Sequence, residues 1–420
     1  MSKRRRITPR LLFAEADGQI YDHPELLMVC RRGPELALPR PDELIPLPEG
    51  SELFLLPGRR ALGLDPETGE LEEMAEAAVA AFVSPGYTLA AQAAYRTTAG
   101  APRLPLFAYG AVGYASGKLW VPAIKVDEDP RQVFTGIPES RIRNGAQALM
   151  KAYPDNRLVR HLAGCALTYA CPAAKNLALG RFEAPLPTSR ACNASCVGCI
   201  SCQPKDSGFP ATQERIGFTP TPSEIVQIMG HHAGRVNKPV LSFGQGCEGE
   251  PLTETKTIAA AIKDFRSAGG RGTVNMNTNG SLPQALGELR AAGLDSVRVS
   301  LNSVRAPLYS AYYRPKSFAH ADVLTFIAEA KRLGLFVSLN YLFVSGVNDT
   351  EDELAALTEL AGRTGLDFIQ MRNLNLDPEL YLGLVPPEMT GPSMGLGHFM
   401  SRLAKACPGL RFGYFNPYLG

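Results

Sequence analysis

The sequence has little net charge and no long apolar stretch. Its 43 lysines and arginines nearly balance 41 aspartates and glutamates, so the formal net charge of the 420 residues is +2. This balance favours neither a nucleic acid nor an anionic membrane as a partner. No apolar run reaches the roughly 18 residues needed to span a bilayer, and no apolar segment follows the basic residues 3–6 as it would in a signal peptide. We therefore expect a cytoplasmic protein without membrane or nucleic acid partners.

Cysteine, in contrast, is well represented, with nine residues. Without a secretion signal, these cysteines are expected to be thiols or metal ligands rather than disulfides. Three of them, Cys192, Cys196 and Cys199, have the spacing C-x3-C-x2-C. Three thiolates on so short a loop converge on one small volume, which suits an iron-sulfur cluster. Zinc is the alternative, because a structural zinc site has four ligands and Cys202 could supply the fourth.

At this loop the sequence resembles the radical SAM superfamily. The resemblance implies that Cys192, Cys196 and Cys199 bind a 4Fe-4S cluster, whose fourth iron binds S-adenosylmethionine (SAM). It also implies that the cluster cleaves SAM reductively to a 5'-deoxyadenosyl radical, which abstracts hydrogen from a substrate. A flavodoxin-type or ferredoxin-type protein would be the reductant. The substrate stays open between a small molecule, a cofactor precursor and a peptide.

The C-terminal half alternates between strand-like and helix-like stretches. The predicted strands are residues 240–243, 273–277, 296–301, 336–343 and 368–371, and a strand before Cys192 would make six. Helix-capping signals begin the helices and glycines end them. Apolar strands alternating with helices predict a parallel sheet covered by helices. The strand count fits the partial (β/α)6 TIM-like barrel of the superfamily, and we assign it to residues 181–420.

Polar motifs follow the predicted strands, at the ends where barrels of this kind carry their chemistry. Residues 244–252, with the sequence GQGCEGEPL, resemble the G-G-E-P loop that binds the SAM amino group, although Glu248 replaces its first glycine. The motifs at the later strand ends resemble SAM-contacting segments of the same family. The SAM-binding residues implied by this resemblance are Gly249, Glu250, Pro251, Thr278, Asn279, Ser300, Asn302, Asn340 and Arg372. For Arg372, the SAM carboxylate and the substrate are both expected partners.

The N-terminal part carries no motif that we recognise. Frequent proline and glycine break residues 1–140 into short apolar runs, which predict a separate strand-rich α+β domain with one helix at residues 72–82. Helical spacing of apolar residues predicts a connector over residues 141–180. A partial barrel has a wide mouth, and radical intermediates must be kept from water. We therefore expect residues 1–140 to cover the C-terminal face of the barrel and to shape the substrate pocket.

Four further cysteines remain to be explained. Cys165, Cys171, Cys202 and Cys247 are a complete ligand set for a second 4Fe-4S cluster. Cys247 alone could instead be a catalytic thiol that gives a hydrogen atom to the substrate. All four could also be small buried apolar side chains.

Two broader alternatives stay open. Within the superfamily, the chain could modify RNA or transfer methyl groups, although its mild charge argues against RNA. Outside enzymes, it could be a non-catalytic iron-sulfur or zinc protein that uses the barrel as a binding platform. The second alternative leaves the SAM-type motifs at successive strand ends unexplained.

Overall fold

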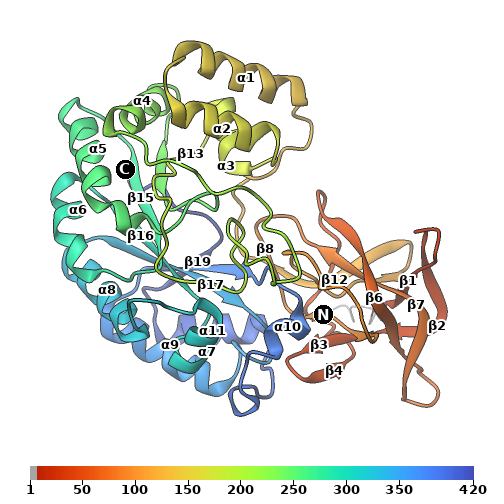
Figure 1. Ribbon diagram of the computed structural model, residues 1–420. Coiled ribbons are helices and arrows are strands. Elements are labelled where there is room, and N and C mark those ends of the chain that lie inside the picture. Colours follow the sequence, from red (N-terminus) through yellow and green to blue (C-terminus); the bar gives the residue numbers. More distant parts are fainter. Residues whose placement is uncertain (1–6) are drawn as a thin grey trace, which may run out of the picture.

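The computed structural model describes residues 7–420, and the basic run at residues 3–6 lies outside this range. Three parts follow one another along the chain: a strand-rich N-terminal region, a segment of three helices, and a parallel sheet with its helices (Figure 1). Across residues 7–420, no helix has both the length and the apolar character that crossing a membrane would require.

The N-terminal region is built from antiparallel strands. Its longest strands, β6 (Glu52–Leu64) and β7 (Leu71–Phe82), pair as a hairpin. The other strands are β1 (Arg10–Ala14), β2 (Ile20–Met28), β3 (Cys30–Arg32), β4 (Glu35–Ala37), β5 (Leu44–Pro46), β8 (Tyr87–Leu89), β9 (Gln92–Ala93), β10 (Tyr95–Thr97), β11 (Gly113–Ala115) and β12 (Lys118–Lys125). The main sheet has the order β10-β6-β2-β1-β11-β12-β5, and β7 pairs with both β1 and β6. The expectation of a strand-rich region is therefore confirmed.

The predicted helix at residues 72–82 is wrong, because this segment is strand β7. Its glutamates and alanines have high helix propensity, but the turn at residues 65–70 returns the chain directly onto β6. Ala80 and Ala81 are fully buried in this pairing. Burial against a neighbouring strand outweighs a propensity difference of well under 1 kcal/mol per residue.

Three helices connect this region to the barrel: α1 (Glu139–Ala152), α2 (Arg157–Leu167) and α3 (Pro172–Leu179). They pack on one another, and α2 and α3 also contact helix α4 (Pro222–Ala233) and strand β13 (Glu183–Pro185), respectively. Asn156 joins the two parts, since its side chain caps α2 by accepting from Val159 N at 2.9 Å and donates to Glu224 O at 2.9 Å.

The C-terminal half contains a seven-stranded parallel sheet with strands in sequence order. The strands after β13 are β14 (Val240–Phe243), β15 (Thr273–Thr278), β16 (Ser296–Leu301), β17 (Phe336–Phe343), β18 (Phe368–Asn373) and β19 (Arg411–Gly413). The α-helices after α4 are α5 (Thr255–Ser267), α6 (Leu286–Ala292), α7 (Ala306–Tyr313), α8 (His320–Arg332), α9 (Glu351–Thr364), α10 (Pro378–Leu382) and α11 (Leu396–Ala406), and the 3-10 helices are η1 (Pro251–Glu254), η2 (Pro283–Ala285) and η3 (Pro387–Met389). The partial barrel is confirmed, and β19 is a short seventh strand that was not predicted.

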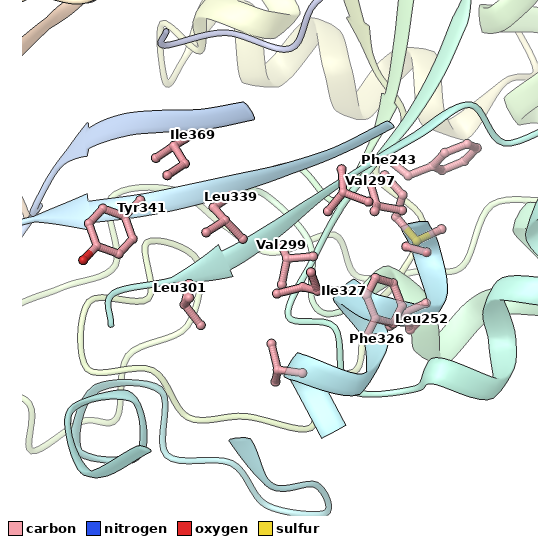
Figure 2. Close-up of a cluster of buried hydrophobic side chains, with 14 of the residues drawn as sticks. Phe243, Leu252, Val297, Val299, Leu301, Phe326, Ile327, Leu339, Tyr341 and Ile369 are labelled. Atoms are coloured by element: carbon pink, nitrogen blue, oxygen red, sulfur yellow. The ribbon is translucent and has the colours of Figure 1, made fainter. Parts of the chain in front are cut away.

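Apolar and polar side chains alternate along strands such as β16, which therefore have an apolar face and a polar face. Val297, Val299 and Leu301 of β16 lie in a buried cluster with residues of the covering helices such as Phe326 (Figure 2). Successive side chains of a strand point to opposite faces, so Arg298 and its neighbours Ser296 and Ser300 point into the barrel. The inner polar groups pair with one another, as Arg298 donates to Gln370 Oε1 at 3.0 Å. Polar groups therefore face the barrel interior.

The N-terminal region docks at the carboxyl end of β18. Thr88 Oγ1 donates to Met371 O at 2.9 Å, and Leu89 N donates to Asn373 Oδ1 at 2.8 Å. Farther along, Arg59 forms a buried ion pair with Asp377 at 2.7 Å. These contacts place the N-terminal region at the rim of the barrel where the strands end.

Candidate functional site

The three spaced cysteines lie on a loop that follows β13, and we call residues 190–199 the cysteine loop. Backbone contacts with the segment after α7 hold this loop in place. Val197 N donates to Tyr312 O at 2.9 Å, and Lys316 N donates to Asn193 O at 2.9 Å. Since this segment comes from beyond the fourth barrel strand, the loop is fixed across the mouth of the barrel.

The cysteines open onto one cavity of about 510 Å³, which we call the cysteine cavity. Cys192, Cys196, Cys199 and Cys202 all line it. Its cationic lining residues are Arg103, Arg215, Arg314 and Lys316. Among them, Arg215 contacts a thiol directly, since its Nη2 lies 3.5 Å from Cys199 Sγ. The cavity therefore combines thiols with positive charge.

Burial makes these thiols difficult to ionise by themselves. It raises the pKa of Cys192, with Arg215 as an opposing influence, and it also raises the pKa of Cys196, with Cys199 adding to the effect. Metal ions bind cysteine as the thiolate and compensate the cost of removing its proton. The donor set thus fits a cluster whose irons supply the positive charge that ionised thiols need.

The loop after β14, residues 244–252, lies against the cysteine loop, and we call it the GEP loop. Gly249 N donates to Ser189 O at 2.7 Å, and Glu250 N donates to Ala191 O at 2.8 Å. A Cβ atom on Gly249 would lie 1.9 Å from Ala191 O, so only glycine allows this approach. The two motifs that the sequence singled out are therefore joined directly.

Glu250 is buried and links the GEP loop to the end of β15. Its carboxylate accepts hydrogen bonds from Leu252 N at 3.1 Å, from Asn279 N at 2.8 Å and from the Thr278 hydroxyl. Burial raises the pKa of Glu250 to about 7, although these donors oppose the shift. Glu250, Thr278 and Asn279 thus form one hydrogen-bonded group.

Glu248, which replaces a glycine of the family motif, has a different environment. Its two carboxylate oxygens accept from four backbone N–H groups: Thr188 at 2.8 Å, Ser189 at 2.9 Å, Gly244 at 2.7 Å and Gln245 at 2.8 Å. The residue is only 4% exposed. Glu248 therefore ties the end of β13 to the end of β14 rather than facing the cysteine cavity.

The remaining predicted SAM contacts lie at the ends of the later strands. Ser300 and Asn340 are direct partners in the β16–β17 register. Arg372 donates to Tyr414 O at 2.9 Å, and its guanidinium lies 3.8 Å from the centre of the Tyr414 ring. Asn302 instead donates to Leu308 O at 3.0 Å and to the Tyr381 hydroxyl at 3.2 Å. Within residues 7–420, none of the nine residues predicted to bind SAM is among those that line the cysteine cavity.

The four further cysteines do not gather at one place. The Cys165 and Cys247 sulfurs lie with a ring nitrogen of His161, all three within 4.8 Å of one another. Cys171 packs in the same apolar cluster, whereas Cys202 is exposed at the cysteine cavity. His161 was not anticipated, although its spacing of four residues from Cys165 on a predicted helix was a usable signal.

Sequence reasoning also missed the cations of the cysteine cavity. Arg314 and Lys316 follow helix α7, Arg215 follows the cysteine loop, and Arg103 belongs to the N-terminal region. No motif includes these residues, and only the fold brings them together.

Comparison with known proteins finds one family model that matches the central segment. Residues 186–358 match the family model described as the radical SAM superfamily. This range contains the cysteine loop, the GEP loop and strands β14 to β17. The match therefore covers the part of the chain from which the site is built.

Curated relatives match less than half of the chain. A GTP 3',8-cyclase from Heliobacterium modesticaldum is 32% identical over 173 residues, which cover 40% of this chain and 48% of the relative. One from Lactiplantibacillus plantarum is 31% identical over 160 residues, which cover 36% of this chain and 44% of the relative. The chain thus spans about half the length of these curated relatives.

Solved structures resemble the chain loosely. HydG, a maturase of the FeFe-hydrogenase, has a TM-score of 0.40 at 15% identity, with 68% of this chain and 67% of that chain covered. Streptococcus suis SuiB bound to the precursor peptide SuiA has a TM-score of 0.40 at 11% identity, with 62% of this chain and 53% of that chain covered.

Proposed function

We propose that the chain binds a 4Fe-4S cluster and SAM and acts as a radical SAM enzyme, because residues 186–358 match the model of the radical SAM superfamily. Cys192, Cys196 and Cys199 are the proposed cluster ligands. The observation that carries this proposal is that all three thiols open onto one cation-lined cavity beside the GEP loop. When held by these cysteines, a reduced cluster would supply the electron for reductive cleavage of SAM, and the 5'-deoxyadenosyl radical so formed would abstract hydrogen from the substrate.

The chain's own residues position the cofactors and exclude water. We propose that residues 249–251 bind the SAM amino group and that Glu250 fixes this loop through Thr278 and Asn279. Ser300, Asn302 and Asn340 are the proposed contacts from the later strands. Arg215 offsets the negative charge of the thiolates, since it lies 3.5 Å from Cys199.

Arg372 is the proposed partner of the SAM carboxylate or of an anionic group on the substrate. A second arginine, Arg298, lies near it, and burial and the charge of Arg372 lower the pKa of Arg298 to about 10. Arg298 Nε has no hydrogen-bond partner among the described residues. Two neighbouring guanidinium groups inside a barrel favour an anion between them.

For the substrate, we propose only broad chemical classes. The curated relatives are named for a cyclisation of GTP, but they share only about half their length with this chain. We therefore propose a small molecule, a cofactor precursor or a peptide. Arg103 reaches the cysteine cavity from the N-terminal region, which supports a contribution of that region to the substrate pocket.

The proposal is tested by anaerobic reconstitution followed by mass spectrometry of the SAM products. We expect 5'-deoxyadenosine from the wild-type protein with a chemical or flavodoxin-type reductant. Cys196→Ala should lose both the brown cluster absorbance and SAM cleavage. Cys407→Ser, a change at the C-terminal end of helix α11, should retain both. Retention of both in Cys196→Ala would refute the ligand assignment. S-adenosylhomocysteine as the main product would instead indicate methyl transfer.

A further inference from the structure

A compact set of ligand atoms lies outside the cysteine cavity, between helix α2 and the GEP loop. His161 and Cys165 are one helical turn apart on α2, and Cys247 lies in the GEP loop. Their ligand atoms are all within 4.8 Å of one another, and Cys165 Sγ lies 3.5 Å from His161 Nε2. Two segments that are distant in sequence thus aim three metal-binding side chains at one point.

We propose that His161, Cys165 and Cys247 bind a single tetrahedral metal ion, with Zn²⁺ as the preferred occupant. In a tetrahedral zinc site, bonds of about 2.3 Å to sulfur and about 2.0 Å to nitrogen separate those two atoms by about 3.5 Å. The observed separation of Cys165 Sγ and His161 Nε2 is 3.5 Å. The side chains therefore already have the spacing of zinc ligands.

The same geometry argues against a second iron-sulfur cluster at this place. A 4Fe-4S cluster binds its cysteines on separate irons, so their sulfurs are farther apart than those on one ion. Cys202, which a four-cysteine cluster would need, lines the cysteine cavity instead. A site for a single metal ion at Cys165 and Cys247 needs no ligand from Cys202.

Cys171 is the fourth ligand that we assign. Structural zinc sites have four protein ligands. Cys171 is the further thiol of the apolar cluster that contains Cys165 and Cys247. Its sulfur lies outside the group of three ligand atoms that are within 4.8 Å of one another, so metal binding would have to bring it closer. Cys171 N also donates to Cys165 O at 3.0 Å, which fixes the two backbones together.

The site joins two parts of the molecule. Cys165 and Cys247 are each 2% exposed, which is typical of a closed structural site rather than of an open catalytic one. Cys247 precedes Glu248, whose carboxylate ties β13 to β14. Metal binding here would therefore anchor the GEP loop to the helical segment, with each cysteine releasing its proton to solvent and no electron transferred.

Metal analysis of the full chain tests this proposal. In wild-type protein with a reconstituted cluster, we expect about four irons and about one zinc per chain. Replacing the zinc by Co²⁺ should give the visible bands of tetrahedral cobalt with thiolate ligands. The double variant Cys165→Ser/Cys247→Ser should lose the zinc and the cobalt bands but retain the iron. The matched control, Cys202→Ser, should retain zinc, because its sulfur lies at the other cavity.

Two results would overturn the proposal. One is about eight irons and no zinc in the wild-type protein, which would indicate a second cluster. The other is zinc retained in the double variant. If the double variant does not fold, X-ray absorption at the zinc edge of the wild-type protein decides, since the site requires sulfur ligands together with one imidazole nitrogen. Loss of SAM cleavage with zinc still bound would count against the proposed activity and not against this site.

Discussion

Glu250, Glu248 and His161 differ in how much of their environment could be predicted from sequence motifs alone. The G-E-P pattern marks a loop that lies against the cysteine loop, and Glu250 connects it with Thr278 and Asn279. The role of Glu248 was hidden, because the turn conformation decides where backbone N–H groups point. His161 was hidden for a related reason: only the fold brings Cys247 to helix α2.

The hydrogen bonds of Glu248 predict that replacing its carboxylate lowers the stability of the protein. In Glu248→Gln, a side-chain amide replaces an oxygen that accepts two backbone N–H groups. Two buried donors would then face an NH₂ group, and an unsatisfied buried group costs about 1–3 kcal/mol. We expect the free energy of unfolding, measured by denaturant titration, to fall by about 1–3 kcal/mol for each of the two donors. Glu214→Gln, at an exposed position, is the matched control and should change it little. Equal values for the two variants would contradict this role of Glu248.

At the scale of elements, prediction succeeded where the pattern was repetitive. The strands β14, β16 and β17 have their predicted bounds, because apolar strands end at helix-capping signals and glycines. Strand β19 has three residues and leaves almost no pattern. Strand β7 was mistaken for a helix, since only its pairing with β6 reveals it.

Helix α4 carries a histidine that makes stability depend on pH. His232 is fully buried, its Nε2 lies 3.2 Å from Phe182 O, and burial lowers its pKa to about 4. The folded form keeps this ring neutral while the unfolded chain binds a proton below about pH 6.5. His232 therefore leaves the free energy of unfolding unaffected above about pH 6.5 and lowers it progressively as the pH falls toward 4.

We expect His232 to remove about 2 kcal/mol from the free energy of unfolding between pH 7 and pH 5. In His232→Gln this contribution should disappear, so the pH dependence should become shallower by about that amount. Denaturant titrations at the two pH values measure it. His398→Gln, at an exposed histidine, is the control. A slope that is unchanged in His232→Gln would show that the ring is not held neutral.

At the scale of the whole molecule, the association of the N-terminal region with the barrel could not be predicted in detail. Arg59 and Asp377 are separated by 318 positions in sequence, yet each side chain is only 5% exposed in their ion pair. Tyr95 donates to the same carboxylate at 2.6 Å. Elsewhere in the interface, the backbones approach so closely that a Cβ on Gly346 would lie 2.6 Å from Gly33 N. The sequence suggested a covering region, but such pairings follow only from the fold.

The buried ion pair allows this docking to be tested. In Asp377→Leu, Arg59 becomes an unpaired buried charge, which costs about 3–5 kcal/mol. Replacing both partners, as in Arg59→Met/Asp377→Leu, removes that charge and should recover most of the loss, because apolar pairs often substitute for buried ion pairs without cost. The Tyr95 hydroxyl loses its acceptor in both variants, so its contribution cancels. Glu379→Gln, at the 34% exposed partner of Arg31, should change stability by less than about 1 kcal/mol. Denaturant titration together with limited proteolysis of the linker at residues 126–138 measures the effect. A double variant as unstable as Asp377→Leu would show that the unpaired charge of Arg59 is not the cause of the lost stability.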